Sequence, residues 1–193
     1  RDSNQGFDHQ LTVQPRMAFG TGHHETTRGL LAEMVGMSWD NKRVLDMGCG
    51  SGVLGIYASL RGASEVVLVD IDPWSVRNTE ENLTLNPVSK DVHHDVREGG
   101  ASVLTPADRH RFDVVIANIN RNILLADMST YIRHLHQGGH LVLSGFFPAD
   151  IPVILDEARG HGLELSESFV KTLEWLQNHT PTKKALEPYE DYG

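Results

Sequence analysis

The run from Val44 to Gly52 constrains the fold more than any other part of the chain. It reads Val-Leu-Asp-Met-Gly-Cys-Gly-Ser-Gly, an apolar strand pattern followed by three glycines at alternate positions. Glycines let the backbone turn sharply and pass against a ligand, because no Cβ stands in the way. A second apolar run ends at Asp70, whose carboxylate can accept hydrogen bonds from a ribose diol. These signals predict a nucleoside-binding strand, turn and helix, with Gly48, Gly50 and Asp70 against the ligand.

An acid placed before the glycines indicates which nucleoside is bound. The stretch 50–55 satisfies the dinucleotide fingerprint G-x-G-x-x-G, with Asp70 eighteen residues after Gly52. Asp46 would repel a pyrophosphate but attract a cation. The sulfonium and ammonium of S-adenosylmethionine therefore favour that cofactor over a nicotinamide dinucleotide. The structural alternative is that Asp46 only caps the turn and the glycines only serve packing.

Length, charge and cysteine content exclude several classes of protein. The chain has 193 residues, a formal charge of −9 and one cysteine, Cys49. This length suits one domain, and the charge disfavours a broad nucleic-acid surface but suits a basic protein substrate. No signal peptide or long apolar stretch is evident, and one cysteine cannot form an internal disulfide. We expect a soluble cytoplasmic protein that does not associate with membranes.

Helical and strand patterns alternate along the chain, which predicts an α/β fold with a doubly wound, mostly parallel, seven-stranded sheet. Strands are expected over 43–47, 66–70, around 92, 112–117 and 141–143, with a closing antiparallel pair over 163–175. Helices are expected from residue 25, over 53–60, 73–86 and 124–135, and over 151–158. The first should carry Leu30, Leu31, Met34 and Val35 inward, and the fourth should end at Gly138-Gly139.

Two further segments border the same strand ends. The glycine-rich stretch 18–27 runs into a helix, so its backbone N–H groups and the Thr27 hydroxyl could hold a ligand carboxylate. An ordinary helix cap is the alternative. Asn118 directly follows the fourth strand, at the crevice where such sheets bind ligands, and can accept a hydrogen bond from an amine. Asn120 is better explained as a turn asparagine bonded to its own backbone.

Other chemically suggestive residues favour structural explanations. The side chains of His93, His94 and Asp95 alternate between the faces of a strand, so they should not converge on a metal ion. Asp95 could contact an adenine amine or be a solvated strand-end acid. Cys49 has no base beside it in sequence and is expected to fill space.

Five motifs follow one another along the chain: Phe19-Gly20-Thr21-Gly22-His23, Asp46 to Gly52, Asp70-Ile71-Asp72-Pro73, Ala117-Asn118-Ile119 and Leu143-Ser144-Gly145. In these motifs and their order, the chain from Met17 to about Gly162 resembles the PrmA family in a Bacteroidetes-like variant. The resemblance implies a Rossmann-like class I methyltransferase fold that uses S-adenosylmethionine, with cofactor contacts at Thr27, Gly48, Asp70 and Asn118.

The same resemblance implies methylation of α-amino and lysine ε-amino groups of protein eleven of the large ribosomal subunit. Asn118 is the candidate that positions the amine, and no general base is evident. Family members carry an N-terminal docking domain. Here we expect a linker remnant over 1–16, the methyltransferase domain over 17–180 and a polar tail over 181–193. The alternatives are a methyltransferase for another protein, a small amine or an RNA, a nicotinamide-dependent oxidoreductase, and a non-catalytic nucleoside-binding module.

Overall fold

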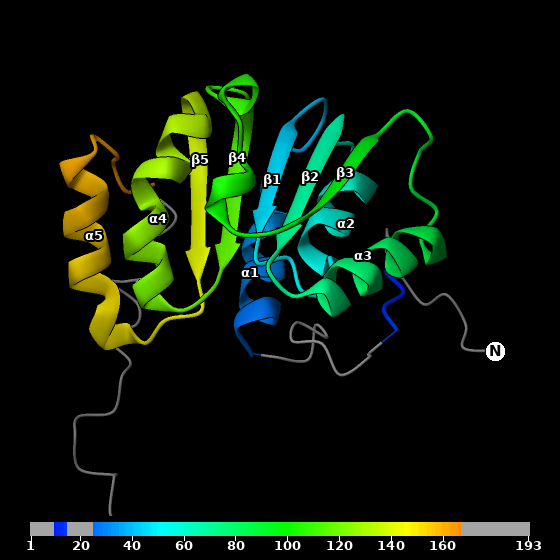
Figure 1. Ribbon diagram of the computed structural model, residues 1–193, viewed down its shortest axis with the longest axis horizontal. Coiled ribbons are helices and arrows are strands. Elements are labelled where there is room, and N and C mark those ends of the chain that lie inside the picture. The colour runs from blue at the N-terminus through cyan, green and yellow to red at the C-terminus, as the bar shows by residue number, and fades with distance from the viewer. Residues whose placement is uncertain (1–9, 15–24, 167–193) are drawn as a thin grey trace, which may run out of the picture.

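A computed structural model describes residues 10–14 and 25–166, in which strands and helices alternate (Figure 1). The strands are β1 (Arg43–Met47), β2 (Glu65–Asp70), β3 (His93–Glu98), β4 (Phe112–Asn118) and β5 (Leu135–Ser144). The helices are α1 (Glu25–Val35), α2 (Val53–Leu60), α3 (Pro73–Leu85), α4 (Arg121–His134) and α5 (Ile151–Gly160). Short 3₁₀ turns are η1 (Ala101–Val103), η2 (Pro106–Asp108) and η3 (Pro148–Asp150). None of the helices in these two ranges is long and apolar enough to span a bilayer.

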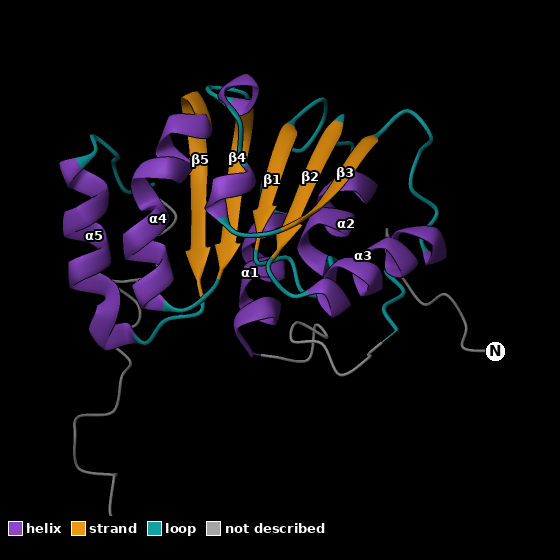
Figure 2. Ribbon diagram, in the orientation of Figure 1, coloured by secondary structure: helices purple, strands orange, loops and turns teal. Residues whose placement is uncertain are grey.

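The five strands form one parallel sheet in the order β3-β2-β1-β4-β5 (Figure 2). Helices α1 and α2 contribute to the core on one face, and α4 and α5 to the core on the other. The doubly wound α/β prediction is therefore confirmed. Chain order reverses between β1 and β4, and open α/β sheets bind their ligands at the carboxyl ends of the strands at such a position. Of the expected closing pair, residues 163–166 form no strand and the remainder lies outside the described residues, as do both expected domain boundaries.

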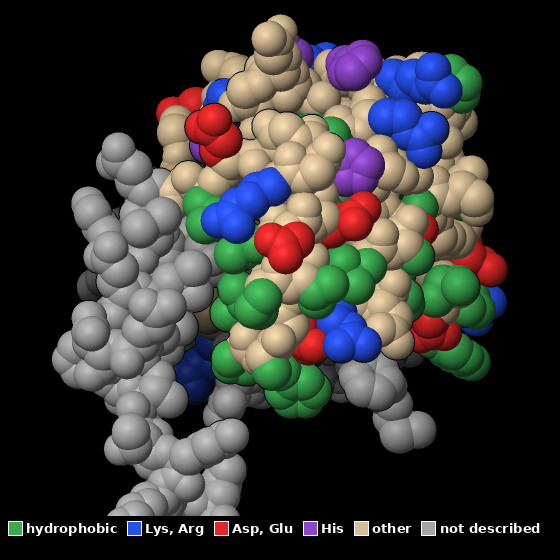
Figure 3. Space-filling view, turned by 90° about the vertical axis from the view of Figure 1, so that its left-hand side faces the viewer, with side chains coloured by type: hydrophobic (Ala, Val, Ile, Leu, Met, Phe, Trp, Pro, Cys, Tyr) green, Lys and Arg blue, Asp and Glu red, His purple; other side chains and the backbone are tan. Residues whose placement is uncertain are grey.

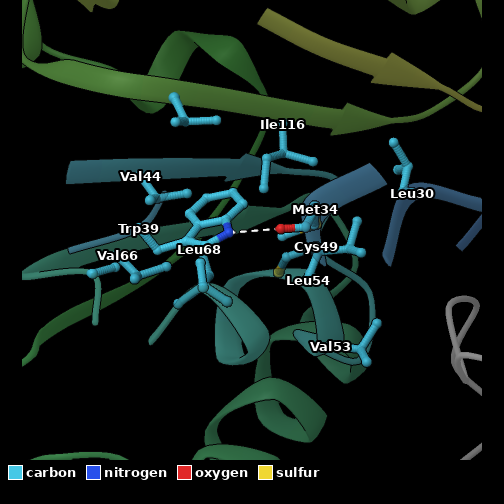
Figure 4. Close-up of a cluster of buried hydrophobic side chains, with 13 residues drawn as sticks. Leu30, Met34, Trp39, Val44, Cys49, Val53, Leu54, Val66, Leu68 and Ile116 are labelled. Atoms are coloured by element: carbon cyan, nitrogen blue, oxygen red, sulfur yellow. Dashed lines mark hydrogen bonds between the residues drawn. The ribbon is translucent and has the colours of Figure 1, made fainter. Parts of the chain in front are cut away.

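Strand alternation divides the buried side chains between two clusters, one on each face of the sheet. The cluster on the α1–α2 face contains Val44, Met34 and the fully buried ring of Trp39 (Figure 4). The Trp39 Nε1–H donates to the Met34 carbonyl oxygen at 2.9 Å, so the indole is satisfied inside the core. Asp46 lies two residues after Val44 and thus faces the same side as this cluster.

Helix α1 buries fewer of its apolar side chains than the sequence predicts. Leu30 and Met34 are buried and Leu31 packs against the same cluster, but Val35 is 58% exposed. The prediction for Val35 is wrong because this last residue of α1 lies beyond the stripe that faces the sheet.

The glycines expected to end the fourth helix lie inside β5 instead. Helix α4 ends at His134, and Leu135 already pairs with Phe112 of β4. The register is irregular after this pair, and Gly138 with its positive φ of 80° lies within the irregular stretch. The helix-stop prediction is therefore wrong, because glycine with positive φ serves a strand irregularity as well as a helix end.

Candidate functional site

The carboxyl edge of the sheet brings the predicted site segments together. Met47 pairs with Val69 on one side and with Ala117 on the other, so β1, β2 and β4 are in register where they end. The residue that follows each of these partners therefore stands at the same edge of the sheet. Those three residues are Gly48, Asp70 and Asn118.

The backbone of the glycine loop, residues 48–52, is bonded within the protein. The amide of Gly48 donates to the Val69 carbonyl oxygen at 2.8 Å, and that of Gly50 donates to Asp70 Oδ2 at 2.8 Å. The Gly52 amide bonds back to a carbonyl oxygen of the loop at 2.8 Å. All three glycines have positive φ, between 58° and 75°. Glycine is needed for this conformation, but the three amides do not point outward as donors to a phosphate.

Asp70 holds the glycine loop in addition to facing the site edge. Its Oδ2 accepts the bond from Gly50, and its Oδ1 accepts from the Asp72 amide at 2.9 Å. Each carboxylate oxygen has a second lone pair, so the partly buried side chain can still accept from a diol. The loop-holding contact is a role that the sequence interpretation did not anticipate.

Asp46 is buried beneath the loop with only 1% of its surface exposed. Its Oδ2 accepts from the Gly55 amide at 3.0 Å, which caps the first turn of α2 in place of a side chain at Gly52. Oδ1 has no hydrogen-bond partner among the described residues. Burial raises the pKa of Asp46 to about 7, although the Gly55 bond lowers it, and nearby Asp70 raises it further. Asp46 therefore caps α2, as the structural alternative holds, and its Oδ1 is a buried oxygen without a partner in the described part of the chain.

Thr27 and Asn118 meet although 91 residues separate them in sequence. The Asn118 amide Nδ2 donates to the Thr27 hydroxyl oxygen at 3.2 Å. This contact leaves the hydroxyl proton of Thr27 as a donor and Oδ1 of Asn118 as an acceptor. The helix start and the end of β4 thus share one small polar cluster, as their predicted positions imply. The preceding stretch 15–24 lies outside the described residues.

Ile119 lies between two glycines, a packing feature that the sequence interpretation missed. A Cβ on Gly48 would overlap the Ile119 side chain, and a Cβ on Gly145 would lie 2.6 Å from the Ile119 carbonyl oxygen. The Ile119 amide also donates to the Ser144 carbonyl oxygen at 3.1 Å. The glycine directly after β5 was the available signal. This packing fixes the chain on one side of Asn118.

The His93 to Asp95 triplet disperses, as alternation along a strand predicts. His93 is exposed, while His94 Nε2 lies 2.9 Å from the Ser59 hydroxyl oxygen and burial lowers the pKa of His94. Asp95 lies in the middle of β3 and pairs with Arg97 at 2.7 Å. Both interpretations that placed Asp95 at the strand end are therefore wrong. In the described ranges, no group of three or more His, Cys, Asp or Glu side chains is arranged to hold a metal ion.

Asn120 and Cys49 have the structural roles expected from the sequence. The Asn120 Oδ1 accepts from the Ile123 amide at 3.2 Å and so caps α4. Cys49 is buried in the core, with its Sγ 3.5 Å from the Thr79 hydroxyl oxygen. Burial raises the pKa of the Cys49 thiol well above its usual value, which keeps the thiol protonated and poorly nucleophilic.

The sequence of the chain is similar to those of known proteins. The family model described as "Ribosomal protein L11 methyltransferase (PrmA)" matches residues 3–182. The chain belongs to the PrmA family. Its sequence is 53% identical over 159 residues to the ribosomal protein L11 methyltransferase of Porphyromonas gingivalis, covering 82% of this chain and 53% of that protein. The Bacteroides fragilis protein of the same name is 49% identical over 156 residues, covering 81% of this chain and 54% of its own length.

A solved structure of a PrmA relative has the same architecture. The ribosomal protein L11 methylase of Lactobacillus delbrueckii subsp. bulgaricus superposes with a TM-score of 0.62 at 31% identity, covering 74% of this chain and 70% of that one. The expected class I methyltransferase fold is therefore confirmed. The chain spans about half the length of the curated PrmA relatives that it matches.

Proposed function

We propose that this PrmA-family chain binds S-adenosylmethionine at the carboxyl edge and transfers its methyl group to protein amines. The observation that carries the proposal is the internal bonding of the glycine loop, together with the buried acid Asp46 in the strand that precedes it. A dinucleotide loop needs outward backbone donors and positive potential for its pyrophosphate. Here the glycine amides are engaged, and before them in sequence lies a buried acid whose Oδ1 has no partner among the described residues. That arrangement suits a cationic nucleoside and disfavours a nicotinamide dinucleotide.

The polar groups of the edge fit the parts of this cofactor. Asp70 would accept from the ribose hydroxyls, and the Thr27 hydroxyl would donate to the carboxylate. Gly50 presents no Cβ to a nucleoside that approaches the backbone, whereas at Gly48 the place of a Cβ is taken by the Ile119 side chain. When bound, the cofactor supplies a methyl group already activated on a sulfonium.

We assign to Asn118 the binding of the amine that accepts the methyl group. Its Oδ1 can accept a hydrogen bond from the incoming amine, while Nδ2 remains anchored on Thr27. An amine near neutral pH is largely protonated, so it must lose a proton to water before it can attack. Asn118 then orients the neutral amine, and the Ile119 packing keeps Asn118 in place.

We assign ribosomal protein L11 as the acceptor, because the PrmA relatives carry that name. The α4–α5 apolar surface, formed by exposed Ile123, Phe147 and Val153, offers a place for a protein to dock. The 2.9 Å ion pair between Arg121 and Asp150 joins its two halves. Figure 3 shows hydrophobic side chains gathered at the lower end, which is the carboxyl edge of the sheet. The net charge of −9 suits a basic partner, and a ribosomal acceptor implies action in the cytoplasm.

Two measurements separate this proposal from its rivals. Calorimetry should show binding of S-adenosylmethionine and S-adenosylhomocysteine but not of NAD. Incubation with labelled S-adenosylmethionine and purified ribosomal proteins should then label protein L11. Binding without transfer would favour a nucleoside-binding module, and label in another protein or in RNA would reassign the acceptor. Binding of NAD alone would refute the proposal.

The role of Asn118 can be tested against a neighbouring asparagine. Asn118→Ala should lower kcat by on the order of 10²-fold, because the amine is no longer oriented. Asn120→Ala removes the cap of α4, so it should reduce the free energy of unfolding by about 1 kcal/mol and leave kcat nearly unchanged. Equal kcat values for Asn118→Ala and the parent chain would exclude the assignment.

A further inference from the structure

Helix α3 is unusual among the helices of this sheet, because every one of its buried residues is polar. Those residues are Ser75, Asn78, Thr79 and Asn82. Their spacing places them on one stripe of the helix, which Asn86 continues beyond the helix end. A helix on a sheet normally buries an apolar stripe. Buried polar groups are retained where they satisfy other polar groups, so the contacts of this stripe identify what it holds.

One side of the stripe holds the glycine loop. The Thr79 hydroxyl donates to the Gly50 carbonyl oxygen at 3.0 Å, and Asn82 Nδ2 donates to the Ser51 carbonyl oxygen at 2.9 Å. A Cβ on Gly52 would lie 2.8 Å from a methyl carbon of Thr79, so loop and helix are closely packed. The position of the loop on which the proposed cofactor lies therefore depends on α3.

The other side of the stripe holds the backbone of residues 10–14. The Gln14 amide donates to Asn82 Oδ1 at 3.0 Å. The Thr12 amide donates to Asn86 Oδ1, and Asn86 Nδ2 donates back to the Thr12 carbonyl oxygen, both at 2.8 Å. Asn82 is thus the residue whose amide group bonds both the glycine loop and residues 10–14.

We propose that Asn82 is a positioning residue that couples cofactor binding on the glycine loop to the attachment of residues 10–14. The inference rests on the proposed function, since it takes S-adenosylmethionine or its product as the ligand. Asn82 is fully buried, so water does not readily replace either bond. When residues 10–14 detach, Asn82 loses the partner of Oδ1 and its hold on Ser51 weakens. A ligand that needs the loop in place opposes this detachment.

The same helix offers a matched control. Asn78 is also buried, at 2% exposed against 0% for Asn82, yet within the described part of the chain neither atom of its amide has a partner. Asn78→Ala therefore removes the same chemical group without breaking a bond. Because an unpaired buried amide is unfavourable, this variant should fold at least as stably as the parent.

Amide hydrogen exchange measured by NMR reports the coupling directly. The Gln14 amide is the direct probe, because its acceptor is Asn82, and the Thr12 amide reports on the same segment through a different acceptor, Asn86. S-adenosylhomocysteine at 100 times its Kd should slow Gln14 exchange by up to about 100-fold. Thr12 should slow with it, because both amides exchange when residues 10–14 detach, and in Asn82→Ala the response of Thr12 to ligand should be lost although its own acceptor is intact. In Asn82→Ala, Gln14 should exchange quickly with or without ligand, and ligand affinity should fall about 2- to 10-fold. Asn78→Ala should behave like the parent chain.

Calorimetry on the same samples distinguishes the possible failures. If ligand binds but Gln14 exchange does not respond, Asn82 is only a structural contact and the inference is overturned while the proposed function stands. If no ligand binds to the parent chain, the proposed function fails and the coupling fails with it. Should Asn82→Ala not fold, the ligand titration of the parent chain still decides, since it needs no variant.

Discussion

Replacing Asp70 with alanine should weaken both the cofactor site and the fold, by separable amounts. The side chain accepts two backbone bonds, from Gly50 at 2.8 Å and from Asp72 at 2.9 Å. Bonds to a charged group contribute about 1.5–3 kcal/mol each, and partial exposure places these at the low end. We expect the free energy of unfolding to fall by about 2–3 kcal/mol in urea titrations. Loss of the ribose acceptors should raise the Kd for S-adenosylhomocysteine by about 10- to 150-fold in calorimetry.

Asp72 supplies the control on the same turn. Its carboxylate caps α3 by accepting from the amides of Trp74 and Ser75, at 3.2 and 3.1 Å. Asp72→Ala should reduce the free energy of unfolding by about 0.5–2 kcal/mol while changing the Kd by less than about threefold. If both variants weaken binding equally, Asp70 acts only by ordering the turn. An unchanged Kd in Asp70→Ala would remove this residue from the site.

Three further predictions concern the loop and the residues beneath it. Gly48→Ala should destabilise the fold by more than about 1–2 kcal/mol in thermal unfolding, because φ is 68° and the new Cβ overlaps Ile119; a milder effect would contradict that packing. Burial raises the pKa of Asp46 from 3.8 to about 7 in the folded state, so between these values the folded state retains a proton that the unfolded state releases. The free energy of unfolding should therefore fall between about pH 4 and 7, by on the order of 1.4 kcal/mol per pH unit, and Asp46→Asn should lack this component. Cys49 should resist alkylation by iodoacetamide at pH 8 until the chain unfolds, which mass spectrometry would detect.

The sequence predicts the central strands because each is a short apolar run bounded by turn residues. Residues 44–47 and 114–117 are buried on both faces, so apolar residues follow one another there with Asp46 as the exception. The start of α3 was equally predictable, since Asp72 and Pro73 form a local cap. The two adjacent glycines, Gly138 and Gly139, led to a wrong prediction of the helix end. Whether such glycines end a helix or lie in a strand irregularity depends on the partner strand.

The site was predictable as a list of edge residues but not as a set of contacts. Parallel strands in register place Asp70 and Asn118 at one edge whatever their neighbours are. The packing of Ile119 and the two-sided bonding of Asn82 join segments far apart in sequence, and no local pattern encodes such partners. The Oδ1 of Asp46, which has no partner in the described part of the chain, likewise follows from burial that only the assembled core creates.

The bonds of residues 10–14 to α3 also set an order of events during synthesis. These bonds join residues 74 and 68 positions apart, across α1, β1, α2 and β2. At about 5–20 residues per second, a ribosome needs several seconds to make that intervening stretch. Residues 10–14 therefore leave the ribosome before their partners and stay as unpaired backbone until α3 has been made. A chaperone that binds extended chain has its opportunity in that interval, before the long loop closes.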